Sequence, residues 1–226
     1  MLPAPLDPLA SSLFSLTAIA TLLLAFVMLG SRWLDNYLYA FAAQSWAIAA
    51  LGAAVGYFAQ APDLYLIAAL TALFRGLVLP YLIWRMIRRL QIARELHETL
   101  RPASALVVGA LAVIFSLFVS HALAGPLGLG GTVAILALTV MMATVLIGFL
   151  MLAIRTEAVS QIFGLLVLEN GVRLGAQILI PGMPLLIELV ILADVLAAVA
   201  CLGVLVRYLL TQFGTASTAG LKRLVG

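Results

Sequence analysis

The sequence of 226 residues has few charged residues, a single cysteine and no cluster of metal-ligating side chains. Only 9% of its residues are charged, against about 25% in an ordinary soluble domain. The single cysteine, Cys201, excludes an intramolecular disulfide and a cysteine cluster for zinc or iron–sulfur. No nucleophile–base set is present, and neither histidine has neighbours suited to a metal. We therefore expect a non-enzymatic chain with no catalytic residue, no metal and no cofactor.

Long apolar runs dominate the chain instead. Hydrophobic residues make up 65% of it, a composition that indicates an integral membrane protein. The net charge is only +3 and the basic residues lie close to the apolar runs, so no nucleic-acid partner is expected. The segments between the runs are too short to form a second domain. We expect a single integral membrane domain over residues 1–226, surrounded by the lipid bilayer.

The apolar runs predict an all-α fold, a bundle of seven transmembrane helices. A helix that crosses a bilayer needs about 20 apolar residues. The sequence has five separate runs of this length and a hairpin of two more, at residues 9–29, 37–58, 64–83, 103–122, 132–154 and 159–207. The first three spans form an N-terminal part, about residues 9–102. The other four form a C-terminal part, about residues 103–226.

The basic residues predict the orientation of these spans. Cytoplasmic loops of membrane proteins carry an excess of Lys and Arg. No Lys or Arg occurs in the N-terminal segment or in the loops at 59–63, 123–131 and 181–184. The loops of the other side and the C-terminal tail hold ten, namely Arg32, Arg85, Arg88, Arg89, Arg94, Arg101, Arg155, Arg207, Lys222 and Arg223. We therefore expect the N-terminus outside and the C-terminus in the cytoplasm.

Residues 84–101 predict a helical extension of the third span. Residues 84–100 contain neither Gly nor Pro, their apolar residues recur at helical spacing, and the segment is rich in arginine. Such a basic amphipathic helix lies on the membrane surface or docks a cytoplasmic partner. Pro102, which follows, is expected in the first turn of the next helix, where proline is tolerated.

Polar and charged residues inside the spans are the candidate functional groups. A charged side chain near the bilayer centre costs at least about 2.5–3.5 kcal/mol on insertion scales, so it is either paired or used. The third span carries one such residue near its middle, and the two runs of the predicted hairpin carry four, with the amide of Asn170 next to one of them. These candidates for proton translocation are Arg75, Glu169, Asn170, Arg173, Glu188 and Asp194.

The geometry of the hairpin predicts which of its charges meet. Antiparallel folding about Gly182 places Glu169 level with Asp194. Two acids in a low dielectric cannot both stay ionised at low cost, so we expect one of them to hold a proton. The same folding places Arg173 level with Glu188, as a candidate ion pair. Alternatively, Glu169 pairs with Arg173 four residues further along its own helix, which does not exclude a role in proton transfer.

Arg75 and the glycines of the sixth span predict contacts between spans. Arg75 lies too centrally to reach water, so it is expected to face Glu169, Asp194 or an acid on a neighbouring subunit. Gly164, Gly171 and Gly175 share a helix face roughly opposite Glu169. Small residues let helices approach closely in membranes. The sixth helix therefore needs protein on two sides.

The hairpin resembles a known family of membrane subunits. The segments Gly164-Leu-Leu-Val-Leu-Glu-Asn-Gly171, Pro181-Gly-Met-Pro-Leu-Leu-Ile-Glu-Leu189 and Asp194-Val-Leu196 resemble hydrogenase-4 component E. Spans five to seven also resemble the three-helix K-type subunit of respiratory complex I and its relatives in multisubunit sodium/proton antiporters. K-type subunits carry a glutamate early in their second helix, where this sequence has Leu166; its own acid, Glu169, lies about one turn further on.

The resemblance implies a non-catalytic membrane subunit of a group 4 nickel–iron hydrogenase or a formate-hydrogenlyase-like complex. Such a complex would lie in a bacterial or archaeal cytoplasmic membrane, and the subunit would contribute intramembrane acids to proton translocation. Its partners would be antiporter-like membrane subunits and a cytoplasmic redox arm. Two alternatives remain: a subunit of a multisubunit sodium/proton antiporter, and a purely structural membrane anchor whose charges are locked in ion pairs.

Overall fold

The structure of the chain is a computed structural model that describes residues 8–58, 60, 62–89, 100–128, 131–179, 200, 203–204 and 207. These residues form a helical bundle, which confirms the predicted all-α class. Its elements are α1 (Pro8–Gly30), α2 (Leu34–Phe58), α3 (Asp63–Leu70), the π-helical segment η1 (Thr71–Val78), α4 (Leu79–Arg89), α5 (Pro102–Ala124), α6 (Thr132–Ile154) and α7 (Ala158–Leu179).

Five of the described helices are long and apolar enough to cross a membrane, as a multi-pass membrane protein requires. They are α1, α2, the continuous helix Leu64–Arg88, α5 and α6. Helix α7 occupies the first run of the predicted hairpin. The predicted turn at 180–184 and most of the second run lie outside the described residues. The total of seven spans and their orientation stay predictions.

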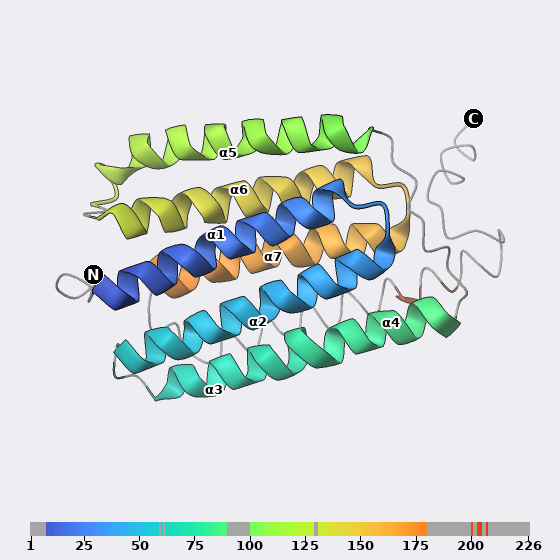
Figure 1. Cartoon of the computed structure of the whole chain (residues 1–226), viewed down its shortest axis with the longest axis horizontal. Coiled ribbons are helices and arrows are strands. Elements are labelled where there is room, and N and C mark those ends of the chain that lie inside the picture. Colours follow the sequence, from blue (N-terminus) through green and yellow to red (C-terminus); the bar gives the residue numbers. More distant parts are fainter. Residues whose placement is uncertain are drawn as a thin grey trace.

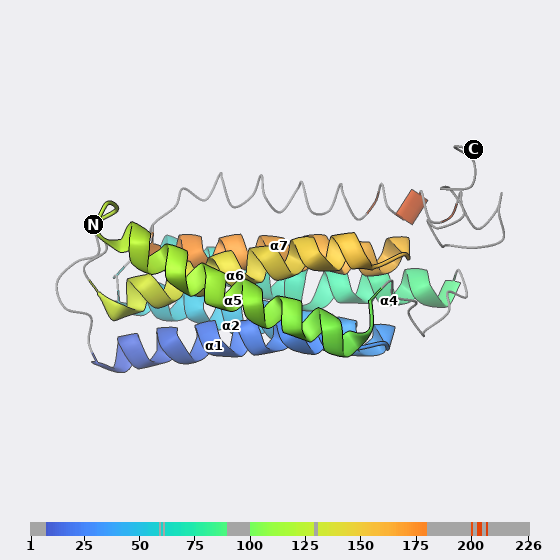
Figure 2. The ribbon, with the colours of Figure 1, turned by 90° about the horizontal axis from the view of Figure 1, so that it is seen from above.

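The helices lie side by side along one common direction. In Figure 1, α5 forms one flank of the bundle, the α3–η1–α4 helix forms the other, and the remaining helices lie between them. Figure 2 shows α1 and α7 on opposite sides of this arrangement. Helix α6 packs against α7, α5 and α1, while α2 packs against α1, α7 and the α3–η1–α4 helix. Helices α2 and α6 thus bring together the outer elements of the bundle.

Proline and an extended residue set the start of α5. Arg101 has φ −63° and ψ 143°, the extended backbone that the residue before a proline prefers. Pro102 then opens the helix, which confirms its predicted place in the first turn. The predicted extension 84–101 is helical up to Arg89. Residues 90–99 of it lie outside the described residues.

Arg155 joins the end of α1 to the link between α6 and α7. Its buried guanidinium donates from Nη2 to the carbonyl oxygens of Leu29 at 2.8 Å and Ser31 at 3.3 Å. The guanidinium also lies 5.4 Å from the ring centroid of Tyr37. The last carbonyls of a helix have no intrahelical donor, so a cation there satisfies them and complements the helix dipole. Arg155 therefore ties α1 to the C-terminal half of the chain.

Glycines hold α6 and α7 backbone to backbone. A Cβ built on Gly148 would lie 2.8 Å from the carbonyl oxygen of Gly164. A Cβ on Gly164 would lie 3.1 Å from the carbonyl oxygen of Gly148, and one on Gly171 would lie 3.1 Å from that of Met141. The close approach predicted for the glycine face of this helix is therefore confirmed. Because the glycines face α6, the opposite face of α7 is available to α2 and η1.

Two apolar clusters fill the bundle, one towards each end. The first contains Tyr37, Phe41 and Phe163, whose rings meet edge to face at centroid distances of 5.5 Å (Tyr37–Phe163) and 6.1 Å (Phe41–Phe163). The second contains Phe14 and Ile48 among its buried residues. In each helix that contributes to both clusters, the residues of one cluster lie in one half of the helix and those of the other cluster lie in the other half. The space between the clusters is where the polar side chains lie.

Candidate functional site

A layer of polar side chains separates the two apolar clusters of the bundle. Along α1, α2, the α3–η1–α4 helix and α7, residues of the two clusters flank a polar residue near the middle of the helix. We call this group the polar layer; it consists of Thr21, Gln44, Arg75, Glu169, Asn170 and Arg173. Four helices thus bring polar atoms to a similar depth. In a bilayer this depth is where polar atoms need protein partners most.

The centre of the polar layer is an ion pair between η1 and α7. Nη1 of Arg75 lies 2.8 Å from Oε2 of Glu169. The Arg75 side chain is 0% exposed and that of Glu169 is 18% exposed. The prediction that Arg75 faces a carboxylate is confirmed, and of the two acids named in this chain the structure brings it to Glu169. A charge-assisted hydrogen bond of this length is among the stronger polar contacts in proteins.

Asn170 extends the ion pair into a chain of hydrogen bonds. Nη2 of Arg75 donates to Oδ1 of Asn170 at 2.8 Å. The amide nitrogen of Asn170 donates to Oε1 of Gln44 at 2.8 Å, and Nε2 of Gln44 donates to the carbonyl oxygen of Thr21 at 3.0 Å. Asn170 thus accepts with its oxygen and donates with its nitrogen, as an amide between a cation and an acceptor must. The chain connects α7, η1, α2 and α1.

Arg75 lies in the one helical segment described here whose backbone bonds run from i to i+5. The segment η1 continues directly into α4 and follows directly from α3. Such π-helical turns are rare and occur frequently at functional sites. Gly76, next to Arg75, lets the indole of Trp46 pack close to the helix. A Cβ at this position would lie only 2.9 Å from the indole nitrogen. The guanidinium lies 5.9 Å from the ring centroid of Phe41, which covers it towards the first apolar cluster.

Arg173 adds a second cation to the polar layer. Its side chain is buried, and it interacts electrostatically with both Arg75 and Glu169. The described part of the layer therefore holds two guanidinium groups and one carboxylate. The predicted partners Glu188 and Asp194 lie outside the described residues. The pairs Glu169–Asp194 and Arg173–Glu188 stay predictions.

Sequence reasoning did not single out Gln44 or Thr21. Gln44 is fully buried and supplies the link between α2 and α7. It is the one amide side chain in the predicted span 37–58, and a lone amide within a membrane helix commonly hydrogen-bonds across a helix interface. Thr21 takes part through its backbone carbonyl, which no side-chain pattern reveals. Composition could therefore have indicated Gln44 but not Thr21.

The chemistry of the layer is that of charge held inside a bundle. Among the residues that the structure describes, no group of three or more His, Cys, Asp or Glu side chains could hold a metal ion. The described groups pair a carboxylate with a guanidinium, and two amide side chains continue the hydrogen bonds from that guanidinium to α2. Such a layer can hold helices in register, and it can carry a proton if water or a further acid reaches Glu169.

Comparison with known proteins gives one relative. The chain is 35% identical over 151 residues to the uncharacterized protein Rv0085 of Mycobacterium tuberculosis (strain ATCC 25618 / H37Rv). The aligned part covers 66% of this chain and 67% of that protein. No family model and no solved structure matches the chain. By this similarity, the chain belongs to the same family as Rv0085.

Proposed function

We propose that the chain is a non-catalytic membrane subunit of a redox-driven, ion-translocating complex of the hydrogenase-4 or formate-hydrogenlyase type. Glu169 of the polar layer and Asp194 are the acids that contribute to proton translocation. The partners of the chain are antiporter-like membrane subunits and a cytoplasmic redox arm. The complex lies in a bacterial or archaeal cytoplasmic membrane. This chain crosses that membrane seven times, with its N-terminus outside and its C-terminus in the cytoplasm.

The observation that carries the proposal is the buried Arg75–Glu169 pair in the middle of the bundle. Ionisable side chains at this depth are costly, and in membrane proteins they mark ion or proton pathways. Its cation, Arg75, lies in a π-helical segment and is hydrogen-bonded to a chain of amides. Its acid also belongs to the segment 164–171, which resembles hydrogenase-4 component E.

The same ion pair favours a second candidate, a structural membrane anchor. A carboxylate that already accepts from a guanidinium at 2.8 Å has a cation to balance its charge. In an anchor, the pair has a structural role alone, which is to fix the register of α7 against η1. The two candidates differ in what neutral variants do, because a structural pair is needed for assembly and a proton site is needed for coupling.

The test is to neutralise the two acids singly in the intact complex. If the chain translocates protons, Glu169→Gln and Asp194→Asn leave the subunits co-purifying in mild detergent but lower the number of protons moved per electron. If the chain is an anchor, the same variants lose co-purifying subunits. Asp35→Asn is the matched control, since Asp35 lies in the first turn of α2, outside the polar layer. Unchanged assembly and unchanged pumping in both variants would exclude both roles for these acids.

The identity of the co-purifying subunits separates the redox complex from the antiporter alternative. Purification of the complex in mild detergent should yield antiporter-like subunits in either case. A cofactor-bearing peripheral arm is expected only for the hydrogenase type. A complex that contains antiporter-like subunits, has no redox arm and exchanges sodium for protons would replace the proposal by the antiporter alternative.

A further inference from the structure

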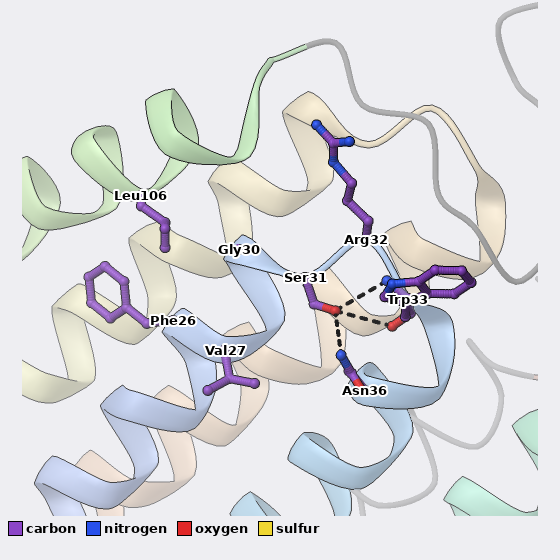
Figure 3. A pocket seen from close by; sticks show the side chains of 8 residues that line it. All are labelled: Phe26, Val27, Gly30, Ser31, Arg32, Trp33, Asn36 and Leu106. Carbon is purple, nitrogen blue, oxygen red and sulfur yellow. Dashed lines mark hydrogen bonds between the residues drawn. The ribbon is translucent and has the colours of Figure 1, made fainter.

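A shallow groove opens where the end of α1, the start of α2 and the first turns of α5 meet. It has a volume of about 480 Å³ and is lined by Phe26, Val27, Gly30, Ser31, Arg32, Trp33, Asn36 and Leu106. Figure 3 shows the apolar side chains of Phe26, Val27 and Leu106 along one part of the groove. The polar side chains of Ser31 and Asn36 lie along the other. The groove therefore has an apolar section and a polar end.

The apolar section runs along the membrane-spanning surface of the bundle. Val27 is 50% exposed, and on α5 the exposed residues Val107 and Leu111 follow Leu106 towards the middle of the helix. Both α1 and α5 are among the helices apolar enough to cross a membrane. A hydrocarbon chain can thus lie against this section and continue along the bundle.

The polar end carries hydrogen-bonding groups and basic charge. The Ser31 hydroxyl accepts from the backbone nitrogen of Trp33 at 3.1 Å and from Nδ2 of Asn36 at 3.0 Å, which fixes the turn between α1 and α2. The exposed guanidinium of Arg32 extends from this turn (Figure 3). Arg101 is also exposed and directly precedes the helix that contributes Leu106. Asp35 is the acidic residue nearest to this turn in sequence.

We propose that this groove binds an anionic phospholipid. One acyl chain lies against Phe26, Val27 and Leu106, and the headgroup phosphate faces Arg32. Trp33, which is 54% exposed, lies at the polar end of the groove (Figure 3), and an indole suits the boundary between hydrocarbon and headgroups. A molecule with an apolar chain and a negative head matches both ends of the groove, and a zwitterionic lipid matches the charged end less well. The site is independent of the polar layer and of the complex proposed above.

The test uses the full chain in nanodiscs of phosphatidylcholine. A small fraction of the lipid is replaced by a lipid with brominated acyl chains, which quench nearby tryptophan fluorescence. This brominated lipid is phosphatidylglycerol in one set of nanodiscs and phosphatidylcholine in the other. The signal of Trp33 is the difference between the unaltered chain and Trp33→Phe. At equal fractions we expect brominated phosphatidylglycerol to occupy the site about fivefold more, the preference expected for one arginine near a membrane surface. Nanodiscs present both leaflets, so the result does not depend on the orientation of the chain.

Two variants and one competitor decide between the possible causes. Arg32→Gln should abolish the preference, whereas Arg85→Gln, which removes a basic residue from α4 outside the groove, should leave it unchanged. Equal loss in both variants would mean a general surface charge effect and would overturn the proposal. Equal quenching by the two brominated lipids would overturn it as well. Loss of the preference on addition of inorganic phosphate would assign the site to a free anion instead of a lipid.

Discussion

Removal of the Arg75 guanidinium should destabilise the bundle more than any other single change in the polar layer. In Arg75→Leu, the carboxylate of Glu169 loses its 2.8 Å partner and Oδ1 of Asn170 loses its donor. Leucine fills part of the volume, so the loss is mainly electrostatic. The double variant Arg75→Leu with Glu169→Leu removes both charges. The remaining loss is then the hydrogen bond that Arg75 donates to Asn170.

The magnitudes for these variants follow from the burial of the pair. Breaking a buried ion pair by removing one partner costs about 3–5 kcal/mol, because the remaining charge is left without compensation. Replacing both partners by apolar residues is often neutral or stabilising. The double variant should therefore be more stable than Arg75→Leu, and the coupling free energy between the two positions should reach about 2 kcal/mol or more.

The assay is reversible unfolding of the detergent-solubilised chain, followed for the parent chain, both single variants and the double variant. Arg101→Leu is the matched control, since Arg101 is an exposed arginine outside the bundle interior. The reasoning is refuted if the effects of Arg75→Leu and Glu169→Leu simply add. Additivity would mean that the two side chains do not share a desolvated contact.

Three further predictions concern topology and packing. A cysteine at Leu127, which is exposed in the turn after α5, should react with an impermeant thiol reagent from outside the cell, and one at Gln91 should not; the reverse pattern would invert the orientation. Gly148→Ala should destabilise the chain by about 1–3 kcal/mol because its Cβ would lie against the backbone of α7, while Gly125→Ala, with open space around it, should have the stability of the parent. Arg155→Leu should lower the unfolding free energy by about 1–3 kcal/mol because the carbonyls at the end of α1 lose their donor, and an unchanged midpoint would remove its capping role.

Helix positions and the central ion pair could be predicted because both follow from strong, local rules. The predicted run 132–154 coincides with α6, since an apolar run of that length has few alternatives. Arg75 had to face an acid because its position excludes water, and few acids lie within the spans. The face of α7 that packs on α6 was predictable from the spacing of Gly164 and Gly171.

The hydrogen-bond chain beyond the ion pair could not be predicted, because it depends on how each helix is rotated. Residue numbers alone predict which residues of two helices lie at the same depth, and they do so only where a short turn joins the two helices. Gln44 reaches Asn170 across a sequence separation of 126 residues, and the rotation of α2 that permits this is set by tertiary packing. The π-helical backbone around Arg75 does have a signal in the sequence, which the prediction did not use. Pro80 lies in α4, two residues after η1, and a proline inside a helix removes the hydrogen bond to the carbonyl four residues earlier, here that of Gly76.

The order in which the polar layer is made has a consequence for biogenesis. Arg75 is synthesised 94 residues before Glu169, so the helix that carries it can enter the membrane long before its partner exists. At about 5–20 residues per second, this interval lasts roughly 5–20 seconds. During that time the guanidinium is a degradation or retention signal for any quality-control factor that recognises charge within a bilayer. We therefore expect chains truncated before α7 to be held at the insertion machinery or degraded, and a nascent chain with Arg75→Leu to leave it sooner.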